Sequence, residues 1–221
     1  MGEDPYGKAY FEGRGSNYWW TVGSYGNFVN FPHWEEILKI IRVFKKSGRL
    51  LDIGCAYGLL VRTASKYFEG YGMDVSQFAL SKSREFRKSD VSRSSAESLP
   101  FRDETFDVVT MMDTLEHVPL MRQCLQDVAR VLRGNGILML QLPNPLLWTR
   151  VCGRFGLADE THENDLWLEE WKVVLDNHGL NVRKCFGMIS YSLRKTKFFI
   201  KSKRLISMFP EWWIVAEKRS S

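Results

Sequence analysis

The chain of 221 residues is 44% hydrophobic and 26% charged, which predicts one ordinary globular domain with a core of its own. The first residues, 1–6, are acidic and polar, and the sequence contains no run of about 18 apolar residues. We therefore expect an intracellular, cytoplasmic protein with no secretory signal and no membrane-spanning helix. Its four cysteines are widely separated, which predicts reduced thiols and neither a disulfide framework nor a cysteine metal site.

The positive charge of the chain is concentrated near its C-terminus. Residues 182–221 hold ten Lys and Arg against two acidic residues, whereas the net charge of the whole chain is +5. The remaining residues are therefore slightly acidic overall. A basic face of this kind attracts nucleic acid, an anionic membrane surface or an acidic substrate, and it is equally compatible with a solvated surface that has no partner.

Strand and helix patterns alternate along the chain after a first segment, 1–48, that is rich in glycine and aromatic residues. We predict strands over 49–53, 71–75, 88–93, 106–112, 137–142, 180–185 and 212–217. We predict helices over 59–68, 77–86, 120–132 and 168–177, with a turn at 133–136. Such alternation is typical of crossover units on a largely parallel sheet that has helices on both faces.

The segment Leu50–Gly58 is an apolar strand that runs into Asp-x-Gly-x-x-x-Gly. Two glycines four residues apart allow a tight turn and leave room for a flat ligand against the backbone. Asp74 ends the second strand, where a carboxylate accepts hydrogen bonds from both hydroxyls of a ribose. Ala56 stands where a dinucleotide site needs its second glycine, and Asp52 repels a pyrophosphate but suits a cationic amino group. The pattern favours a nucleoside-containing ligand other than a dinucleotide.

Four ordered segments carry a resemblance to a known family: LDIGCAYG at 51–58, GMDVS at 72–76, AESLPFRDETFDVV at 96–109 and LEHVP at 115–119. They resemble the class I S-adenosylmethionine-dependent methyltransferases, in the branch of small-molecule and quinone-type enzymes. Residues 161–171 resemble the segment that leads into the fifth helix of this branch, and 212–218 its final strand. The resemblance implies an α/β, Rossmann-like sheet of seven mostly parallel strands in the order 3-2-1-4-5-7-6, with the last strand antiparallel and helices on both faces.

The resemblance also implies a role for each residue of the cofactor site. The turn expected to hold the methionine end of S-adenosylmethionine consists of Asp52, Gly54, Cys55, Ala56 and Gly58. Asp74 would bind the ribose hydroxyls, the alternative being that it caps the following helix, and Val75 and Ser76 would border the adenine. Met111 and Met112 would pass close to the sulfonium, although Met also fills gaps in ordinary cores.

Ser95, Ala96 and Glu97 stand where the family usually has Asp-Ala-Glu. The Ser95 hydroxyl would then replace the carboxylate that accepts a hydrogen bond from the adenine amino group, with more of the anchoring left to the backbone at Ala96. For Glu97, a role in holding its own loop is an equal alternative to a role at the ligand.

Methyl transfer from a sulfonium is an in-line displacement, so alignment and exclusion of water supply much of its rate. His117 and His162 are the candidate catalytic residues, because an imidazole removes protons near neutral pH. For His117 we favour lining or closing the cofactor pocket; His162 is a candidate base or substrate contact, or a residue that packs its loop. Carboxylates and histidines do not cluster at ligand spacing, so we expect no metal site and no metal-assisted methylation.

The acceptor is expected to be an unidentified small molecule. The fourth strand ends at 111–114 without the Asn/Asp-Pro-Pro-aromatic segment that grips a flipped base, so DNA is not expected as a substrate. The alternatives are an RNA methyltransferase or a noncatalytic scaffold with the same fold.

We predict a single methyltransferase domain over 1–221, with its cofactor core at 49–143. Segment 1–48 would be an aromatic lid over the pocket or a strap on the sheet edge. Segment 144–166 would form another wall of the pocket. The basic segment 189–209 would be a solvated helical excursion between the sixth and seventh strands, with binding to an anionic membrane or to RNA as alternatives.

Overall fold

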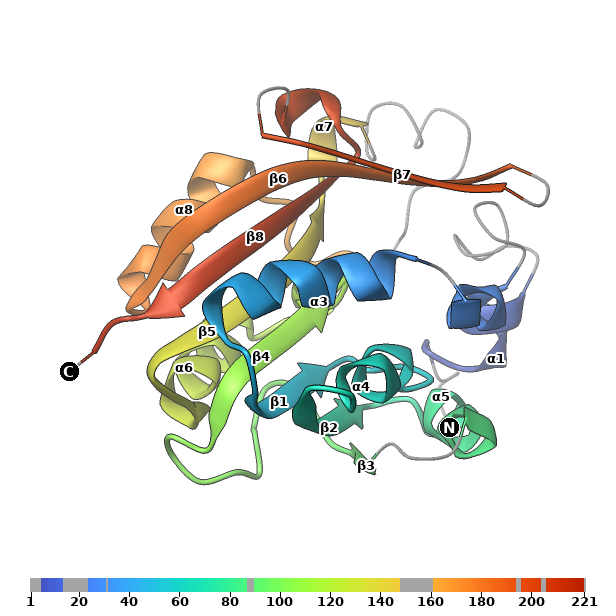
Figure 1. Cartoon of the computed structure of the whole chain (residues 1–221), viewed down its shortest axis with the longest axis horizontal. Helices are drawn as coiled ribbons and strands as arrows, with labels where there is room; N and C mark the ends of the chain where they lie inside the picture. Colours follow the sequence, from blue (N-terminus) through green and yellow to red (C-terminus); the bar gives the residue numbers. More distant parts are fainter. Residues whose placement is uncertain are drawn as a thin grey trace.

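The computed structural model describes residues 5–13, 24–30, 32–86, 90–147, 161–193, 196–203 and 206–220. Within these ranges eight strands form one sheet in the order β3-β2-β1-β4-β5-β8-β6-β7 (Figure 1). Their bounds are β1 Gly48–Ile53, β2 Phe68–Asp74, β3 Asp90–Arg93, β4 Phe106–Met112, β5 Leu132–Pro143, β6 Leu180–Leu193, β7 Thr196–Ser202 and β8 Glu211–Lys218.

The predicted order of seven strands is confirmed, with β8 as the seventh strand of the prediction. Strands β1 to β5 pair in parallel, and β8 is antiparallel to both of its neighbours, β5 and β6. The eighth strand, β7, is an addition that pairs antiparallel with β6 at the edge of the sheet.

This additional strand contradicts the helical excursion predicted over 189–209. β6 continues to Leu193, and β7 returns along it with Gly187 opposite Ser202 and Met188 opposite Lys201. The only helical piece described in this region is a 3-10 turn at Ile206–Met208. The sequence there is rich in β-branched and aromatic residues, and the edge of β6 offers backbone donors and acceptors that a second strand satisfies. Figure 1 shows the pair as an arm that extends beyond the start of β8.

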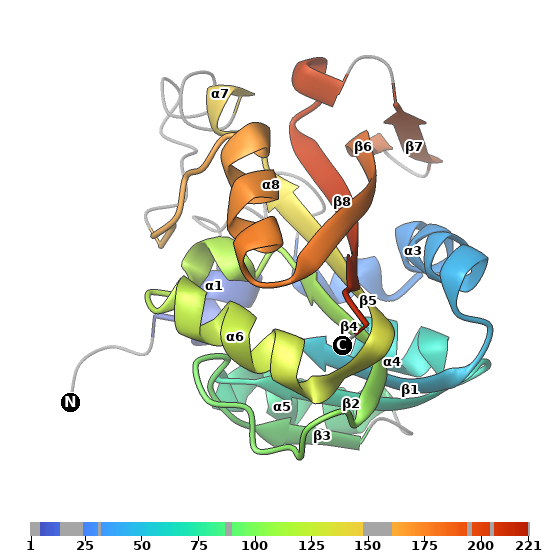
Figure 2. The same ribbon diagram turned by 90° about the vertical axis from the view of Figure 1, so that its left-hand side faces the viewer.

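Helices cover both faces of the sheet (Figure 2). Their bounds are α1 Lys8–Glu12, α3 His33–Phe44, α4 Leu59–Ala64, α5 Gln77–Ser83, α6 Met121–Val131, α7 Pro145–Leu147 and α8 Leu168–Asn177. One core lies between the sheet and α6 and α8, and the other between the sheet and α3, α4 and α5. Alternating strand residues supply the two cores, since Leu51 belongs to the first and Leu50 to the second.

Several predicted boundaries differ from the structure, among them those of one helix and one turn. The helix predicted over 59–68 ends at Ala64, because Phe68 already begins β2. The turn predicted at 133–136 lies inside β5, where it loops out of the ladder: Phe106 pairs with Leu132, but Val108 pairs with Ile137. Glycines and an Asn135 φ of 60° allow this local excursion.

The N-terminal segment contributes two helices, and its role as a lid or as a strap stays a prediction. Its helix α3, which the sequence interpretation missed, packs on a face of the sheet through Trp34, Ile37, Leu38 and Ile41. Its helix α1 lies instead near α5, over the turn that follows β1, and Phe11 packs against Tyr57 with ring centroids 5.6 Å apart. Four of the aromatic residues assigned to a lid, Tyr18, Trp19, Trp20 and Phe31, lie outside the described residues.

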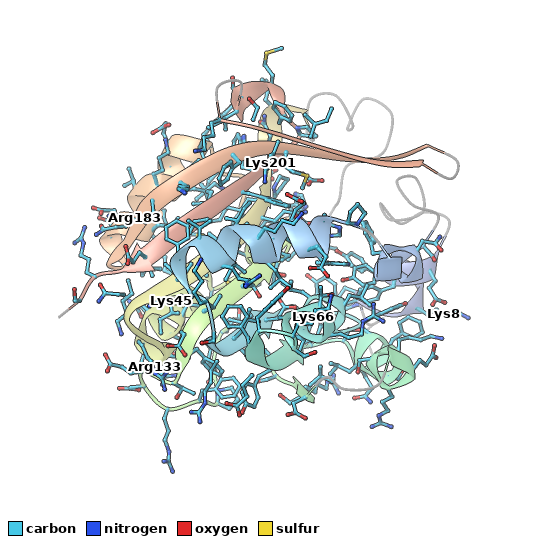
Figure 3. The ribbon with its side chains drawn as sticks, viewed as in Figure 1. Lys8, Lys45, Lys66, Arg133, Arg183 and Lys201 are labelled. Carbon is cyan, nitrogen blue, oxygen red and sulfur yellow. The ribbon has the colours of Figure 1, made fainter. Side chains whose placement is uncertain are left out.

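In the described part of residues 182–221, the basic side chains lie against acidic groups or aromatic rings of the protein. Lys201 of β7 lies 3.0 Å from Glu36 of α3, and Arg183 lies 3.2 Å from Glu217. Lys184 and Lys203 lie over the rings of Phe44 and Phe186, while Lys218 and Arg219 pair with Glu104 and Asp176. The cations labelled in Figure 3 lie well apart from one another. Binding of these basic residues to RNA or to an anionic membrane stays a prediction.

Three cysteines are free thiols in the described part of the chain. Cys55 and Cys124 are buried and Cys185 is partly buried, and burial raises the pKa of the Cys124 thiol to about 12. Cys152 lies outside the described residues. None of the described helices combines the length and the apolar character that crossing a membrane requires.

Candidate active site

The turn after β1 is held by backbone hydrogen bonds to the end of β2. The N–H groups of Gly54 and Cys55 donate to the Met73 carbonyl at 2.8 and 3.0 Å. Gly54 has a φ of +73°, and a Cβ placed there would lie 2.2 Å from Oγ1 of Thr114. Glycine is therefore required at position 54 for two reasons, its backbone conformation and the close approach of Thr114. Gly58, with a φ of +69°, is the N-cap residue that precedes α4.

Asp74 connects this turn to the start of α5. Its Oδ2 accepts the Ala56 N–H and its Oδ1 accepts the Ser76 N–H, both at 2.8 Å. A carboxylate has about four acceptor positions, so two backbone donors leave capacity for further donors such as ribose hydroxyls. The helix cap is the Ser76 hydroxyl, which accepts the Ala79 N–H at 3.0 Å. The predicted cap is thus confirmed at Ser76, and the alternative that Asp74 caps the helix is wrong.

Asp52 lies beneath the turn as a buried carboxyl group. Its Oδ1 accepts a hydrogen bond of 2.6 Å from the Thr110 hydroxyl. Burial raises the pKa of Asp52 to about 7, the Thr110 hydrogen bond opposes this rise, and the charge of Asp74 adds to it. A cation next to Asp52 would favour its ionised form, so the site is suited to an ammonium group.

The loop after β3 holds the candidates for contact with an adenine. The Ser95 hydroxyl accepts the Glu97 N–H at 3.2 Å. The Glu97 carboxylate accepts the Leu120 N–H at 3.2 Å, and the Glu97 carbonyl accepts a hydrogen bond of 2.9 Å from Gln123. Glu97 thus ties the loop to the start of α6, as its alternative interpretation predicted. Ala96 is buried at the base of the loop.

The other residues predicted around the cofactor differ in their exposure. Val75 is 42% exposed, whereas Ser76 is fully buried and its hydroxyl donates to the Tyr6 carbonyl at 2.6 Å. Met111 is fully buried in the core shared with α6, while Met112 is partly buried and packs on the opposite core. Of the two methionines, Met112 therefore keeps an accessible surface and Met111 belongs to the core.

The two candidate histidines lie next to each other, with ring centroids 4.8 Å apart. His117 belongs to the 3-10 helix Leu115–His117 that follows β4, and its Nδ1 lies 3.1 Å from the Thr161 carbonyl oxygen. The Nδ1 atom of His162 lies 3.3 Å from Oδ1 of Asp165. The Glu116 carbonyl accepts the N–H groups of Glu163 and Asn164, which draws the 161–164 segment against the end of β4.

This packing contradicts the premise that carboxylates and histidines do not cluster. Glu116, His117 and His162 each place one possible ligand atom within 4.8 Å of the others. Glu116 and His117 are adjacent in sequence, but His162 comes from the segment that the Glu116 carbonyl holds in place. The rings of Tyr6 and Tyr10 approach His117 edge-on, with centroids 6.1 and 6.4 Å away.

Comparisons with known proteins agree with this geometry. A family model described as a methyltransferase domain matches residues 51–140, which include the turn, Asp74 and the segment after β4. The uncharacterized methyltransferase YcgJ of Bacillus subtilis is 29% identical over 143 residues, 60% of this chain and 56% of YcgJ. The demethylmenaquinone methyltransferase of Bacillus licheniformis is 25% identical over 194 residues, 84% of this chain and 78% of that enzyme. The match to YcgJ thus spans little more than half of that protein.

A solved structure shows the same fold. The S-adenosylmethionine-dependent methyltransferase from Thermotoga maritima, described as a possible histamine N-methyltransferase, superposes with a TM-score of 0.69 at 18% identity. The superposition covers 92% of this chain and 98% of that one. Together, these comparisons support a class I S-adenosylmethionine-dependent methyltransferase.

Several residues of the methyltransferase site were missed by the sequence interpretation. Thr110 and Thr114 contact the turn from β4 and from the residues after it, and Tyr6 and Tyr10 approach His117 from the N-terminal segment. Glu116 joins the two histidines. For Glu116 a signal was present, because it lies within the Leu-Glu-His-Val stretch that carries the family resemblance. Tyr6 and Tyr10 had no such signal among the many aromatic residues of the N-terminal segment.

Proposed function

We propose that this methyltransferase binds S-adenosylmethionine in the turn after β1 and transfers its methyl group to a small-molecule acceptor. The observation that carries the proposal is the Asp74 carboxylate, held at the carboxyl end of β2 by the Ala56 and Ser76 amides. In open α/β sheets, ligands bind at this edge, where the strand order reverses between β1 and β4. A carboxylate held there by two backbone donors is oriented for ribose hydroxyls.

The contacts of the turn support specific roles for its residues. Asp52 binds the cationic amino group of the methionine end, and the backbone of Gly54, Cys55, Ala56 and Gly58 curves around that end. Asp74 binds the ribose hydroxyls. Val75 and Ser76 lie along one side of the adenine, and the Ser95–Glu97 loop lies along the other, with Ala96 beneath it. Met112 supplies apolar surface near the sulfonium.

Transfer then requires only that the acceptor be aligned with the methyl group. A lone pair of the acceptor forms a bond to the methyl carbon, the S–CH₃ bond breaks, and its electron pair stays on sulfur to give the neutral thioether product. An acceptor that starts with a proton loses it to a base or to water. The face where the acceptor would lie includes Tyr6, Tyr10, His117 and His162, which form a compact aromatic wall. A wall of this size suits a small-molecule acceptor. The name of one relative, a demethylmenaquinone methyltransferase, is in keeping with an acceptor of this class.

Calorimetric titration of the protein with S-adenosylmethionine, its demethylated product and NAD tests the cofactor. We expect both sulfur nucleosides to bind and NAD not to bind. Asp74→Ala should weaken binding by about 1–3 kcal/mol, or about 5- to 150-fold, whereas Asp176→Ala, which removes a surface partner of Arg219, should leave it unchanged. Folded protein that binds neither sulfur nucleoside would overturn the proposal.

The acceptor class is tested with radiolabelled S-adenosylmethionine. Transfer of the labelled methyl group is compared between a metabolite extract and bulk RNA from the same cells. We expect the label in small molecules. Label found only in RNA would refute a small-molecule acceptor while leaving the cofactor assignment intact.

A further inference from the structure

The cluster of Glu116, His117 and His162 has a composition that goes beyond what methyl transfer alone requires. One carboxylate and two imidazoles place ligand atoms within 4.8 Å of one another. Glu116 is almost completely buried, and a carboxylate away from water is stabilised by a nearby positive charge. The other acidic groups of the site, Asp52 and Asp74, lie at the ligand turn and not in this cluster.

Both imidazoles have a second partner that would orient them as metal ligands. The Nδ1 atom of His117 lies 3.1 Å from the Thr161 carbonyl oxygen and 2.9 Å from the Thr161 hydroxyl oxygen, and this hydroxyl can donate or accept. The Nδ1 atom of His162 lies 3.3 Å from the Asp165 carboxylate. When each Nδ1 donates its proton to these oxygens, the Nε2 atom keeps its lone pair for an ion. Histidines that bind metals are held in the same way, with the other ring nitrogen donating to a carbonyl or a carboxylate.

We propose that Glu116, His117 and His162 bind one divalent transition-metal ion. Two imidazoles and one carboxylate are the protein ligands of several catalytic zinc sites and of non-haem iron sites. Mg²⁺ prefers an all-oxygen environment, so this set favours Zn²⁺, Co²⁺ or Fe²⁺ over Mg²⁺. With metal–nitrogen bonds of about 2.0–2.1 Å, ligand atoms of a tetrahedral ion lie about 3.3–3.5 Å apart. Binding therefore draws the widest pair together by little more than about 1 Å.

The position of the ion in the fold indicates what it would do. Glu116 and His117 follow Thr114, whose side chain packs against Gly54 in the turn that we assign to the cofactor. The ion would thus lie beside the cofactor, on the side assigned to the acceptor. Three protein ligands leave at least one coordination position open, and a hydroxyl oxygen of the acceptor that occupies it becomes more acidic. This role rests on the proposed function, whereas metal binding itself does not.

The histidines then act as metal ligands and not as a base. Held by these residues, the ion would make an acceptor hydroxyl more acidic, so that its proton could pass to water. The oxygen would then form the bond to the methyl carbon as the S–CH₃ bond breaks and its electron pair stays on sulfur. The alternative is a purely structural cluster, in which the ring contact and the Thr161 and Asp165 hydrogen bonds merely hold the 161–165 segment in place. The two differ in whether the isolated protein binds an ion.

To test the site, chelator-treated protein is titrated with Co²⁺, Zn²⁺ and Mg²⁺. Binding is measured by calorimetry and, for Co²⁺, by its visible absorption. We expect one Co²⁺ or Zn²⁺ per chain and weaker binding of Mg²⁺. His162→Ala and Glu116→Gln should each weaken Co²⁺ binding at least 100-fold, and Asp165→Asn about 10- to 100-fold. His178→Ala is the matched control, because His178 lies at the end of α8 with its Nδ1 on the Val174 carbonyl, and it should leave binding unchanged.

S-adenosylmethionine binding is measured on the same samples, which separates the two proposals. Protein that binds S-adenosylmethionine but binds no Co²⁺, or that binds Co²⁺ equally well after His162→Ala and Glu116→Gln, would overturn the metal site alone. Azide added to the Co²⁺ protein should shift its visible spectrum if a coordination position is open. An unchanged spectrum would overturn the role of the ion toward the acceptor.

Discussion

The Gly54→Ala substitution tests the turn after β1 most directly. Gly54 has a φ of +73°, and a left-handed backbone costs about 1–2 kcal/mol for a residue with a Cβ. The new Cβ would also lie 2.2 Å from Oγ1 and 2.6 Å from Cγ2 of Thr114, an overlap that adds about 1–3 kcal/mol. We therefore expect Gly54→Ala to lower the free energy of unfolding by about 2–5 kcal/mol. That is a large share of the stability of a typical domain.

Urea denaturation, monitored by circular dichroism, measures this change. Calorimetry measures S-adenosylmethionine binding by the fraction of the variant protein that stays folded. Gly134→Ala is the control, because a Cβ at Gly134 meets nothing within 4 Å, and it should stay within about 0.5 kcal/mol of the parent. Adding Thr114→Ala removes the two closest atoms and leaves Cβ at 3.0 Å. The double variant should therefore recover part of the lost stability. Equal stabilities of Gly54→Ala and Gly134→Ala, or no recovery in the double variant, would refute the reasoning.

Three further substitutions test other parts of the molecule by urea denaturation. Because burial raises the pKa of Asp52 to about 7, the folded chain binds more protons than the unfolded chain between pH values of about 4 and 7. The contribution of Asp52 to stability should therefore fall as pH rises through this range. Asp52→Asn should make the free energy of unfolding less dependent on pH there. A variant whose stability changes with pH in parallel with the parent would contradict the raised pKa of Asp52. Ser76→Ala removes the cap of α5 and should cost about 0.5–2 kcal/mol, and no loss would place the cap elsewhere. Gln141→Leu leaves the buried indole N–H of Trp213 without its acceptor and should cost about 1–3 kcal/mol, whereas a neutral result would show that another acceptor is available.

The order of the sheet and the turn at its centre were predictable because their signals are local. The apolar run into Asp52 and Gly54, the acidic end of β2 at Asp74 and the cap at Ser76 each depend on a few consecutive residues. Each of these features lies in the structure where the sequence places it. Their roles toward a cofactor stay predictions until binding is measured.

Helix α3 was missed although its signal was present. Trp34, Ile37, Leu38 and Ile41 follow the spacing of a buried helix face, and all four are buried. The glycines and aromatic residues before them suggested an irregular segment and obscured the periodicity. Here the signal was available and was outweighed by composition.

Strand β7 and the Glu116 cluster depend on contacts between distant residues. β7 forms because the edge of β6 accepts it, which the composition of 189–209 alone does not reveal. His162 reaches Glu116 and His117 because the Glu116 carbonyl holds Glu163 and Asn164. A search for metal ligands at short sequence spacing omits a set whose members lie 45 positions apart.

The short piece of chain that follows β4 contacts two neighbouring segments. Thr114 packs against Gly54 on one side, and two residues later the Glu116 carbonyl holds the 161–164 segment on the other. A substitution in this piece would disturb both the turn and the 161–164 segment, so it offers a poor route to a new acceptor. Changes in acceptor choice are better sought at the side chains of Tyr6 and Tyr10, which approach His117 and make no described contact with Gly54.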